Sequence, residues 1–336
     1  SRCLVGSEMC IRDSTCAILD NGDLKCWGRD NHGQLGDGGS NTDTTAPSST
    51  AIDLGTGRTA VAVSAGELHT CAILDNGDLI CWGRDNHGQL GNGETITGAQ
   101  TSPPSTAIDL GTGRTAVAVS AGSDHTCAIL DNGDMKCWGR DNAGQLGIAG
   151  SSSDITAPSS TAIDLGTGRT AVAVSAGHEH TCAILDNGDL KCWGRDSDGQ
   201  LGNGGSNTNT NAPSTAIDLG TGRTAIAVSA GYKHTCAIVD NGAMKCWGDN
   251  YQGALGNGGN TDQTSPVAVS GSNTWDSSTG ASSGSGSGSG GGLANVTGAT
   301  CTVSPSLPTG LNIDSSTCAI SGTPMAETVN RTYTVT

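Results

Sequence analysis

Short segments in which apolar and polar residues alternate recur along the chain, separated by longer connections rich in Gly, Asn and Ser. The segment AVAVSAG at 60–66 has the period of two that is typical of a half-buried strand. TCAIL at 15–19 and LKCWG at 24–28 flank an Asp-Asn-Gly tripeptide, which predicts two strands joined by a hairpin. TAIDL at 50–54 predicts one further short strand. The pattern therefore predicts units of about four strands and no helix of any length.

The hairpin segment is written five times at almost constant spacing. Each copy ends in Cys-Trp-Gly, and successive tryptophans are separated by 55, 56, 55 and 54 residues. These tryptophans are Trp27, Trp82, Trp138, Trp193 and Trp247. A period of this size indicates a repeat architecture, and about four short strands are the content of one propeller blade. The predicted fold class is all-β: a β-propeller of about 55-residue, four-stranded blades, of which five are present.

Ten of the 14 cysteines form pairs that are ten residues apart, and each pair brackets one Asp-Asn-Gly tripeptide. A three-residue loop with its glycine in the left-handed conformation places the first cysteine directly across from the second, in a non-hydrogen-bonded pair. The glycines are Gly22, Gly77, Gly133, Gly188 and Gly242. The cysteines are Cys16 with Cys26, Cys71 with Cys81, Cys127 with Cys137, Cys182 with Cys192, and Cys236 with Cys246. The register predicts a disulfide across every hairpin.

Zinc and buried free thiols are the alternatives to these disulfides. Structural zinc sites usually pair cysteines two to four residues apart on a tight turn, and no pair here has that spacing. Disulfides are therefore the favoured interpretation. They indicate an oxidising compartment, so we expect an extracellular or cell-surface protein.

The segments VSAGxxHTCAIL, NGDLKCWG and GQLG, followed by a proline and another strand, recur in this order between residues 15 and 270. This combination resembles the repeat of the regulator of chromosome condensation family. The resemblance implies a β-propeller, which in that family has seven blades. With five units, we expect the ring to be incomplete or open. The paired cysteines are similar to a secreted branch of the family and unlike its nuclear branch.

The two ends of the chain depart from the repeat. Residues 1–14 resemble a translated sequencing adaptor, so we leave them, with Cys3 and Cys10, outside the fold. Residues 271–292 predict a flexible Gly/Ser linker. PSLPTGLNID and ISGTP within residues 293–336 resemble an immunoglobulin-like domain found on large prokaryotic surface proteins. This resemblance implies a β-sandwich, which we expect to be truncated here, and the oxidising context favours pairing of Cys301 with Cys318.

Composition argues against several classes of partner. The chain has 16 Lys and Arg residues against 32 Asp and Glu, a formal net charge of −16, whereas nucleic-acid binding depends on basic residues. No run of about 18 apolar residues predicts a membrane-spanning helix. The expected partner is therefore an extracellular protein or glycan, with no nucleic acid and no direct membrane insertion.

Several motifs have both a chemical and a structural interpretation. GTGRTA at 55–60 matches a dinucleotide fingerprint, but a strand follows it where the fingerprint needs a helix, so we interpret it as a turn. The recurrent His69, His125, His180 and His234 are interpreted as structural. The Asp- and Asn-rich loops fit no calcium motif and leave only weak calcium binding open; no other cofactor is expected. Catalytic groups are single, whereas every reactive group here is copied, which predicts a protein that is not an enzyme.

The preferred function is therefore non-enzymatic binding or adhesion at the cell surface or outside the cell. The connections after Cys-Trp-Gly differ between copies, and variable loops on a constant frame carry specificity. They are residues 37–49, 92–105, 148–160, 203–214 and 257–265. The alternatives are a secreted enzyme inhibitor, as in the β-lactamase-inhibitor propellers, and a guanine nucleotide exchange factor-like regulator. A propeller lyase or hydrolase needs a single, unrepeated catalytic group.

Overall fold

The computed structural model describes residues 14–39, 41–150, 153–205, 208–213 and 215–271, and four short strands in the C-terminal part of the chain. The chain divides into two compact units. The first comprises Ser1–Trp275 with Ser283–Gly292, and the second comprises Asp276–Ser282 with Leu293–Thr336.

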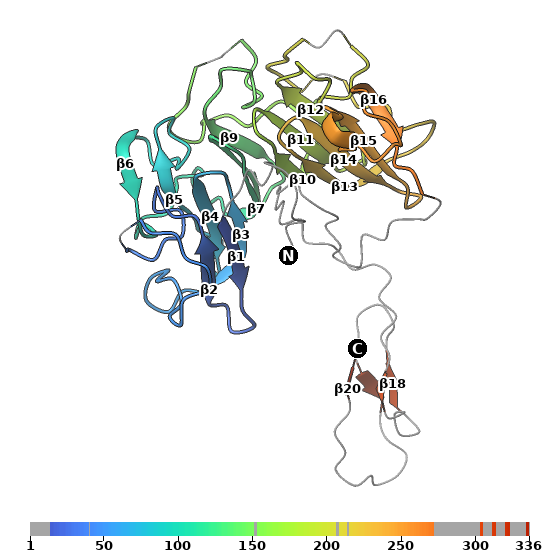
Figure 1. Cartoon of the computed structure of the whole chain (residues 1–336). Helices are drawn as coiled ribbons and strands as arrows, with labels where there is room; N and C mark the ends of the chain where they lie inside the picture. Colours follow the sequence, from blue (N-terminus) through green and yellow to red (C-terminus); the bar gives the residue numbers. More distant parts are fainter. Residues whose placement is uncertain are drawn as a thin grey trace. The chain divides into compact units, whose positions relative to one another are not determined.

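The first unit consists of five antiparallel sheets that follow one another along the chain and are called blades 1 to 5 (Figure 1). Blade 1 is described by β1 (Ser14–Ile18) and β2 (Leu24–Gly28). Blade 2 contains β3 (Ala60–Ala65), β4 (His69–Leu74), β5 (Leu79–Asp85) and β6 (Ile96–Gln100). Blade 3 contains β7 (Ala116–Ala121), β8 (His125–Leu130) and β9 (Met135–Gly139). Blade 4 contains β10 (Ala171–Ala176), β11 (His180–Leu185) and β12 (Leu190–Gly194). Blade 5 contains β13 (Ala225–Ala230), β14 (His234–Val239), β15 (Met244–Gly248) and β16 (Gln263–Ala268).

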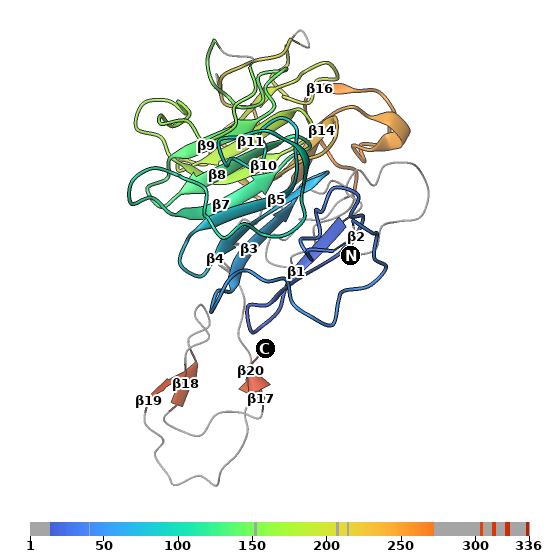
Figure 2. The ribbon, with the colours of Figure 1, turned by 90° about the vertical axis from the view of Figure 1, so that its left-hand side faces the viewer.

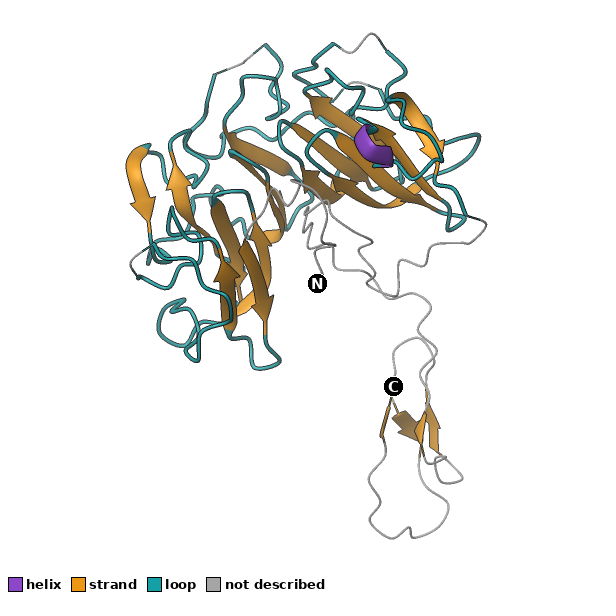
Figure 3. Ribbon diagram, viewed as in Figure 1, coloured by secondary structure: helices purple, strands orange, loops and turns teal. Residues whose placement is uncertain are grey.

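The structure is all-β in the part of the chain that it describes, apart from the single 3-10 turn η1 (Tyr251–Gly253) in blade 5 (Figure 3). In the second unit, β17 (Val303–Ser304) pairs with β20 (Thr334–Val335), and β18 (Leu311–Ile313) pairs with β19 (Ile320–Gly322). Both pairs are antiparallel. Cys301 and Cys318 lie outside the described residues, as do residues 1–13 and the stretch 272–292.

The Asp-Asn-Gly loop sets the register of each hairpin. Leu19 N–H donates to Asp23 O at 2.8 Å, and Gly22 N–H donates to Leu19 O at 2.9 Å. The loop glycines have φ between 79° and 82°, the left-handed region that glycine adopts without strain. Cys16 therefore lies opposite Cys26, and the same pairing recurs in the other four hairpins. The two sulfurs of every pair are at disulfide distance, with Cα atoms 4.0 to 4.1 Å apart.

The strand predicted for TAIDL at 50–54 is wrong. These residues belong to no strand, and Ile52 N–H donates one hydrogen bond to Leu24 O. The fourth strand comes from earlier in the connection, as β6 and β16, or as a single bridge at Thr44, Ile155 or Thr210. The segment is held by its apolar side chains instead of a ladder: in the copy between blades 2 and 3, Ile108 and Leu110 are 8% and 4% exposed. The segment was predicted as a strand because Ile and Leu stand at alternate positions, which here serves burial.

The blades form an arc that does not close into a ring (Figures 1 and 2). The inner strands β3, β7, β10 and β13 pack against one another in chain order. Each hydrophobic cluster lies between two neighbouring blades; one, for example, joins Ile129 and Met135 of blade 3 to Leu185 and Trp193 of blade 4. Many thin cores shared between repeats need less apolar material than one large core, which explains a hydrophobic content of only 34%.

Candidate functional site

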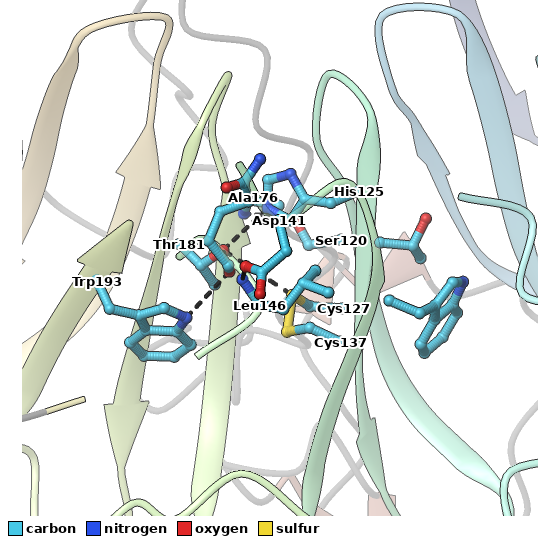
Figure 4. The surroundings of a disulfide bond; sticks show 12 residues. Ser120, His125, Cys127, Cys137, Asp141, Leu146, Ala176, Thr181 and Trp193 are labelled. Carbon is cyan, nitrogen blue, oxygen red and sulfur yellow. Dashed lines mark hydrogen bonds between the residues drawn. A yellow bond between two sulfur atoms is a disulfide. The ribbon is translucent and has the colours of Figure 1, made fainter. Parts of the chain in front are cut away.

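Residues that recur along the repeats hold the blades together. Between blades 3 and 4, His125 Nε2 lies 2.9 Å from Thr181 Oγ1, and the Thr181 hydroxyl donates to Gln145 O at 2.8 Å (Figure 4). Trp193 Nε1 donates to the same carbonyl oxygen at 3.0 Å. His69 and His180 make the same contact with a threonine of the next blade. Burial lowers the pKa of His180 to about 3, with smaller effects from neighbouring histidines, so this imidazole is neutral.

The other motifs with a chemical interpretation also have structural partners. Arg58 and Thr59 of the GTGRTA segment bind the Asp75 carboxylate, and β3 follows the segment directly. At the hairpin tip, Asn76 Nδ2 donates to Asp78 Oδ2 at 2.7 Å. Within the described residues, no group of three or more His, Cys, Asp or Glu side chains is arranged to hold a metal ion. Weak calcium binding stays an untested prediction.

A buried carboxyl lies at the end of the third strand in blades 1 to 4, where blade 5 has an amide. In blade 2, Asp85 is fully buried and its Oδ1 accepts from Leu90 N–H at 2.9 Å. In blade 5, Asn250 Oδ1 accepts from Leu255 N–H in the same way. The Asn250 amide also donates to Asn257 Oδ1, Gly259 O and Thr261 O at 3.2, 3.1 and 3.0 Å. A carboxylate in the same position has no proton to donate to such oxygens.

Asp85→Asn is expected to stabilise the propeller by about 1–3 kcal/mol at pH 8. Burial raises the pKa of Asp85 to about 6, against an ordinary value of 3.8; the Leu90 N–H lowers it and Glu94 raises it. Because the folded-state pKa is the higher one, wild-type stability at this site increases as pH falls from above 6 towards 4. The advantage of the variant should therefore shrink over that range. Urea unfolding of both proteins from pH 8 to pH 4 tests this, with Asn250→Asp as the reverse change; an unchanged difference across the range contradicts the prediction.

A second set of residues differs between blades and occupies one position in the fold. The turns between the inner strand and the second strand contain the residue pairs Glu67–Leu68, Ser123–Asp124, His178–Glu179 and Tyr232–Lys233, here called the axial turns. The N–H groups of Glu67, Ser123 and His178 each donate to a glycine carbonyl of the next blade, at 3.1 to 3.3 Å. The axial turns are therefore adjacent at one end of the inner strands.

Arginines from the ends of the third strands lie beside these turns. Arg140 N–H donates to Asp124 O at 2.9 Å, and Arg195 N–H donates to Glu179 O at 2.8 Å. Their guanidinium groups bind the carboxylates of the same turns: Arg140 lies 3.3 Å from Asp124 Oδ2, and Arg195 contacts Glu179 Oε2. Arg84 lies 3.6 Å from Asp124 Oδ1. These ion pairs form a charged rim that runs across blades 2 to 4.

The rim carries charge close to the protein surface. Burial tends to raise the pKa of Glu179, but hydrogen bonds from Arg195 and Asn142 outweigh it and lower the pKa, so the carboxylate stays ionised. The His178 ring lies 4.0 Å from the Tyr232 ring, centroid to centroid. Burial lowers the pKa of His178, against the effect of Glu179 and other carboxylates. Fixed charges of both signs and a partly exposed aromatic pair suit a polar macromolecular partner.

Comparison with known proteins places this geometry in a family. Residues 6–288 match the family described as RCC1-like domain. The chain belongs to the RCC1-like family. Residues 259–336 match the family described as Putative Ig domain, so an Ig-like segment follows the RCC1-like propeller.

Two curated relatives span most of the RCC1-like repeats. The ultraviolet-B receptor UVR8 of Arabidopsis thaliana is 35% identical over 214 residues, which cover 63% of this chain and 46% of the relative. The E3 ubiquitin-protein ligase HERC2 of Homo sapiens is 30% identical over 209 residues, 62% of this chain and 4% of the relative. The chain spans less than half the length of both relatives.

Solved structures agree on the fold. Human WBSCR16 has a TM-score of 0.67 at 22% identity, covering 78% of this chain and 66% of that one. Yeast RCC1 (Prp20), solved with Kap60 bound to it, has a TM-score of 0.65 at 19% identity, covering 77% of this chain and 60% of that one. At this level of identity the likeness concerns the propeller fold.

The binding surface predicted from the sequence is the set of connections after Cys-Trp-Gly, a prediction that stays untested, and it does not include the axial turns. The connections do include many exposed residues, such as 45–51 and 105–106. The signal for the turns was present: the two positions between Ala-Gly and His-Thr read Glu-Leu, Ser-Asp, His-Glu and Tyr-Lys within an otherwise constant motif. Two variable positions are easily overlooked beside connections of a dozen residues. Only the fold shows that they lie side by side.

Proposed function

We propose that this RCC1-like propeller is a non-enzymatic extracellular binding module that recognises a protein partner through the axial turns and their arginines. The observation that carries the proposal is where the repeats differ. The residues that join the blades are copied almost without change, whereas the charged and aromatic side chains of the axial turns are different in each blade and are held side by side. A constant frame that presents different side chains is typical of a recognition surface.

Charge supports a protein partner. The side chains of Arg140 and Arg195 stay 32% and 39% exposed while they bind carboxylates of the turns. Charged groups held in place favour a partner of complementary charge and exclude others. One structurally similar propeller, yeast RCC1 (Prp20), is described with protein ligands in two structures: bound to Kap60 in one, and with binding properties to Gsp1p and histones in the other. Those partners belong to that protein, and they support only the class of interaction.

The cysteine pairs support the proposed extracellular location. Five cross-strand disulfides in one chain are typical of proteins that fold in an oxidising environment. The Ig-like segment that follows the propeller is consistent with a protein displayed outside the cell.

Arg195→Ala is expected to weaken binding of the protein partner at least tenfold, because it removes a charge from the rim. The matched control is Arg169→Ala: that side chain is also 39% exposed, but it pairs with Asp186 at a hairpin tip. The partner is first selected on an array of extracellular proteins and glycans, and affinities are then measured by surface plasmon resonance. Tyr232→Ala provides a second change, in the axial turn of blade 5, that removes no charge.

Three results would count against this function. They are binding to glycans alone, equal losses for Arg195→Ala and Arg169→Ala at unchanged melting temperatures, and catalytic turnover at the rate of an enzyme. Circular dichroism of each variant shows whether the fold is retained.

A further inference from the structure

The repeat is broken at one buried position. The residue before the second cysteine of each hairpin is a lysine in four blades and Ile80 in blade 2. The lysines are Lys25, Lys136, Lys191 and Lys245. Ile80 occupies the same register as the lysines: it lies opposite Ala72, as Lys136 lies opposite Ala128. Ile80 is 2% exposed.

The lysine ammonium groups bind backbone carbonyls of the neighbouring connections. Lys136 Nζ donates to Leu110 O at 3.0 Å, and Lys191 Nζ donates to Leu165 O at 3.0 Å. Lys25 Nζ donates to Ser48 O and Ser49 O at 2.9 and 3.2 Å. Lys136 is only 7% exposed, so its alkyl stem and its ammonium group fill the space between these carbonyls.

The equivalent carbonyls of blade 2 have no such donor. They belong to Leu54, which corresponds to Leu110, and to Pro104 and Ser105, which correspond to Ser48 and Ser49. Ile80 is shorter than lysine and has no group that can donate. In the part of the chain that the structure describes, no N–H or side chain donates to these three oxygens.

A hollow of about 390 Å³ lies at this place. Its walls include the apolar side chains of Leu54, Ile80, Pro103 and Pro104. Asp53 and Asp78 also line it. Arg58 is the one cation of the lining, and its guanidinium is paired with Asp75 at 3.1 Å. The hollow therefore combines an apolar channel, backbone acceptors and carboxylates, which are the groups that an alkylammonium needs.

We propose that this hollow binds the lysine side chain of a partner polypeptide. The alkyl stem would lie against Ile80 and the two prolines, and the ammonium would take the place that the protein's own lysine fills in the other blades. Exposed residues on both sides of the hollow, at 55–58 and 105–106, leave room for the partner backbone to lie across it. The net charge of −16 favours approach of a cation. This inference rests on the proposed protein-binding function and identifies one contact of it.

The test uses peptides that differ only in the ammonium group. The Leu54 methyl signals of the full chain are followed by NMR during titration with N-acetyl-Gly-Lys-Gly-amide, with the norleucine peptide, and with n-butylammonium. We expect the lysine peptide to shift the Leu54 signals with an affinity at least tenfold higher than that of the norleucine peptide. The Ile80→Lys variant should lose the response, because its own ammonium fills the site as in the other blades. The matched Lys136→Ile variant should create a new response at Leu110.

Each other outcome overturns the proposal. Equal responses to the lysine and norleucine peptides would show a merely apolar hollow. A response to n-butylammonium without one to the lysine peptide would show a site for free amines. No response in the wild-type protein, or an unchanged response in a folded Ile80→Lys variant, would show that the hollow binds no lysine. The array experiment with Arg195→Ala probes the axial turns and does not involve this hollow, so either proposal can fail alone.

Discussion

Refolding of the propeller in the presence of reductant is expected to fail, whereas the oxidised protein should fold cooperatively. Each disulfide closes a loop of about ten residues. In the loop-entropy account this raises the free energy of the unfolded chain by about 2.5–3 kcal/mol. There are five such links, and a typical domain is stable by only about 5–15 kcal/mol. The links also support cores that are thin and shared between blades. Urea unfolding and refolding followed by circular dichroism, with and without reductant, measures this effect.

Buried sulfurs require a separate control for access. Cys127 and Cys137 are 0% and 1% exposed, so reductant reaches them only when the hairpin opens. The double variant Cys127→Ala with Cys137→Ala removes one link without this difficulty and should lower the free energy of unfolding by about 2–4 kcal/mol. Alkylation of the protein unfolded in urea without reductant, followed by mass spectrometry, should find the ten hairpin cysteines blocked. Free thiols in most pairs, or equal stability with and without reductant, would contradict the assignment and the extracellular location inferred from it.

Gly147→Ala is expected to destabilise the propeller by about 3 kcal/mol or more. Gly147 has φ of +73°, which costs an L-residue about 1–2 kcal/mol. A Cβ atom there would also lie 2.6 Å from Trp193 Nε1 in the next blade. Trp193 is fully buried, and its Nε1 donates to Gln145 O, so it cannot move away without loss of packing and of that bond. Chemical denaturation monitored by tryptophan fluorescence provides the measurement.

Gly168→Ala separates the strain of the backbone from the clash. Gly168 has a similar φ of +69°, and a Cβ atom there meets nothing within 4 Å. The free energy of unfolding of this variant should fall only by the cost of the backbone strain, about 1–2 kcal/mol. Equal losses of stability in the two alanine variants would show that a clash with Trp193 is not what destabilises Gly147→Ala. The comparison therefore tests the contact between blades 3 and 4 directly.

The frame and the surface of this propeller have different physical requirements. The frame uses the same contact at the three boundaries from blade 2 to blade 5, so His125, Thr181 and their equivalents recur there with almost the same distances. The proposed binding surfaces depend on differences between blades, which are found in the axial turns and at Ile80. A rigid frame also lowers the entropic cost of holding a recognition surface in place.

The amino-acid sequence alone determined the five-fold all-β repeat and the register of every hairpin, because these depend on local features. Strand alternation, the Asp-Asn-Gly loop and the ten-residue spacing all act within about 15 consecutive residues. The TAIDL segment was misassigned because apolar residues at 50–54 serve burial between blades and not a strand ladder. Its local pattern contains no information about which of the two applies.

The tertiary structure decided which residues meet between one blade and the next. The axial turns are more than 50 residues apart in sequence and become neighbours only when the inner strands pack side by side. In the sequence, Ile80 resembles an ordinary core residue. The structure shows that the equivalent residue of blade 3, Lys136, binds Leu110 O. Both the frame glycines and the candidate binding surfaces depend on such contacts between blades, because each repeat buries its apolar face only against its neighbour.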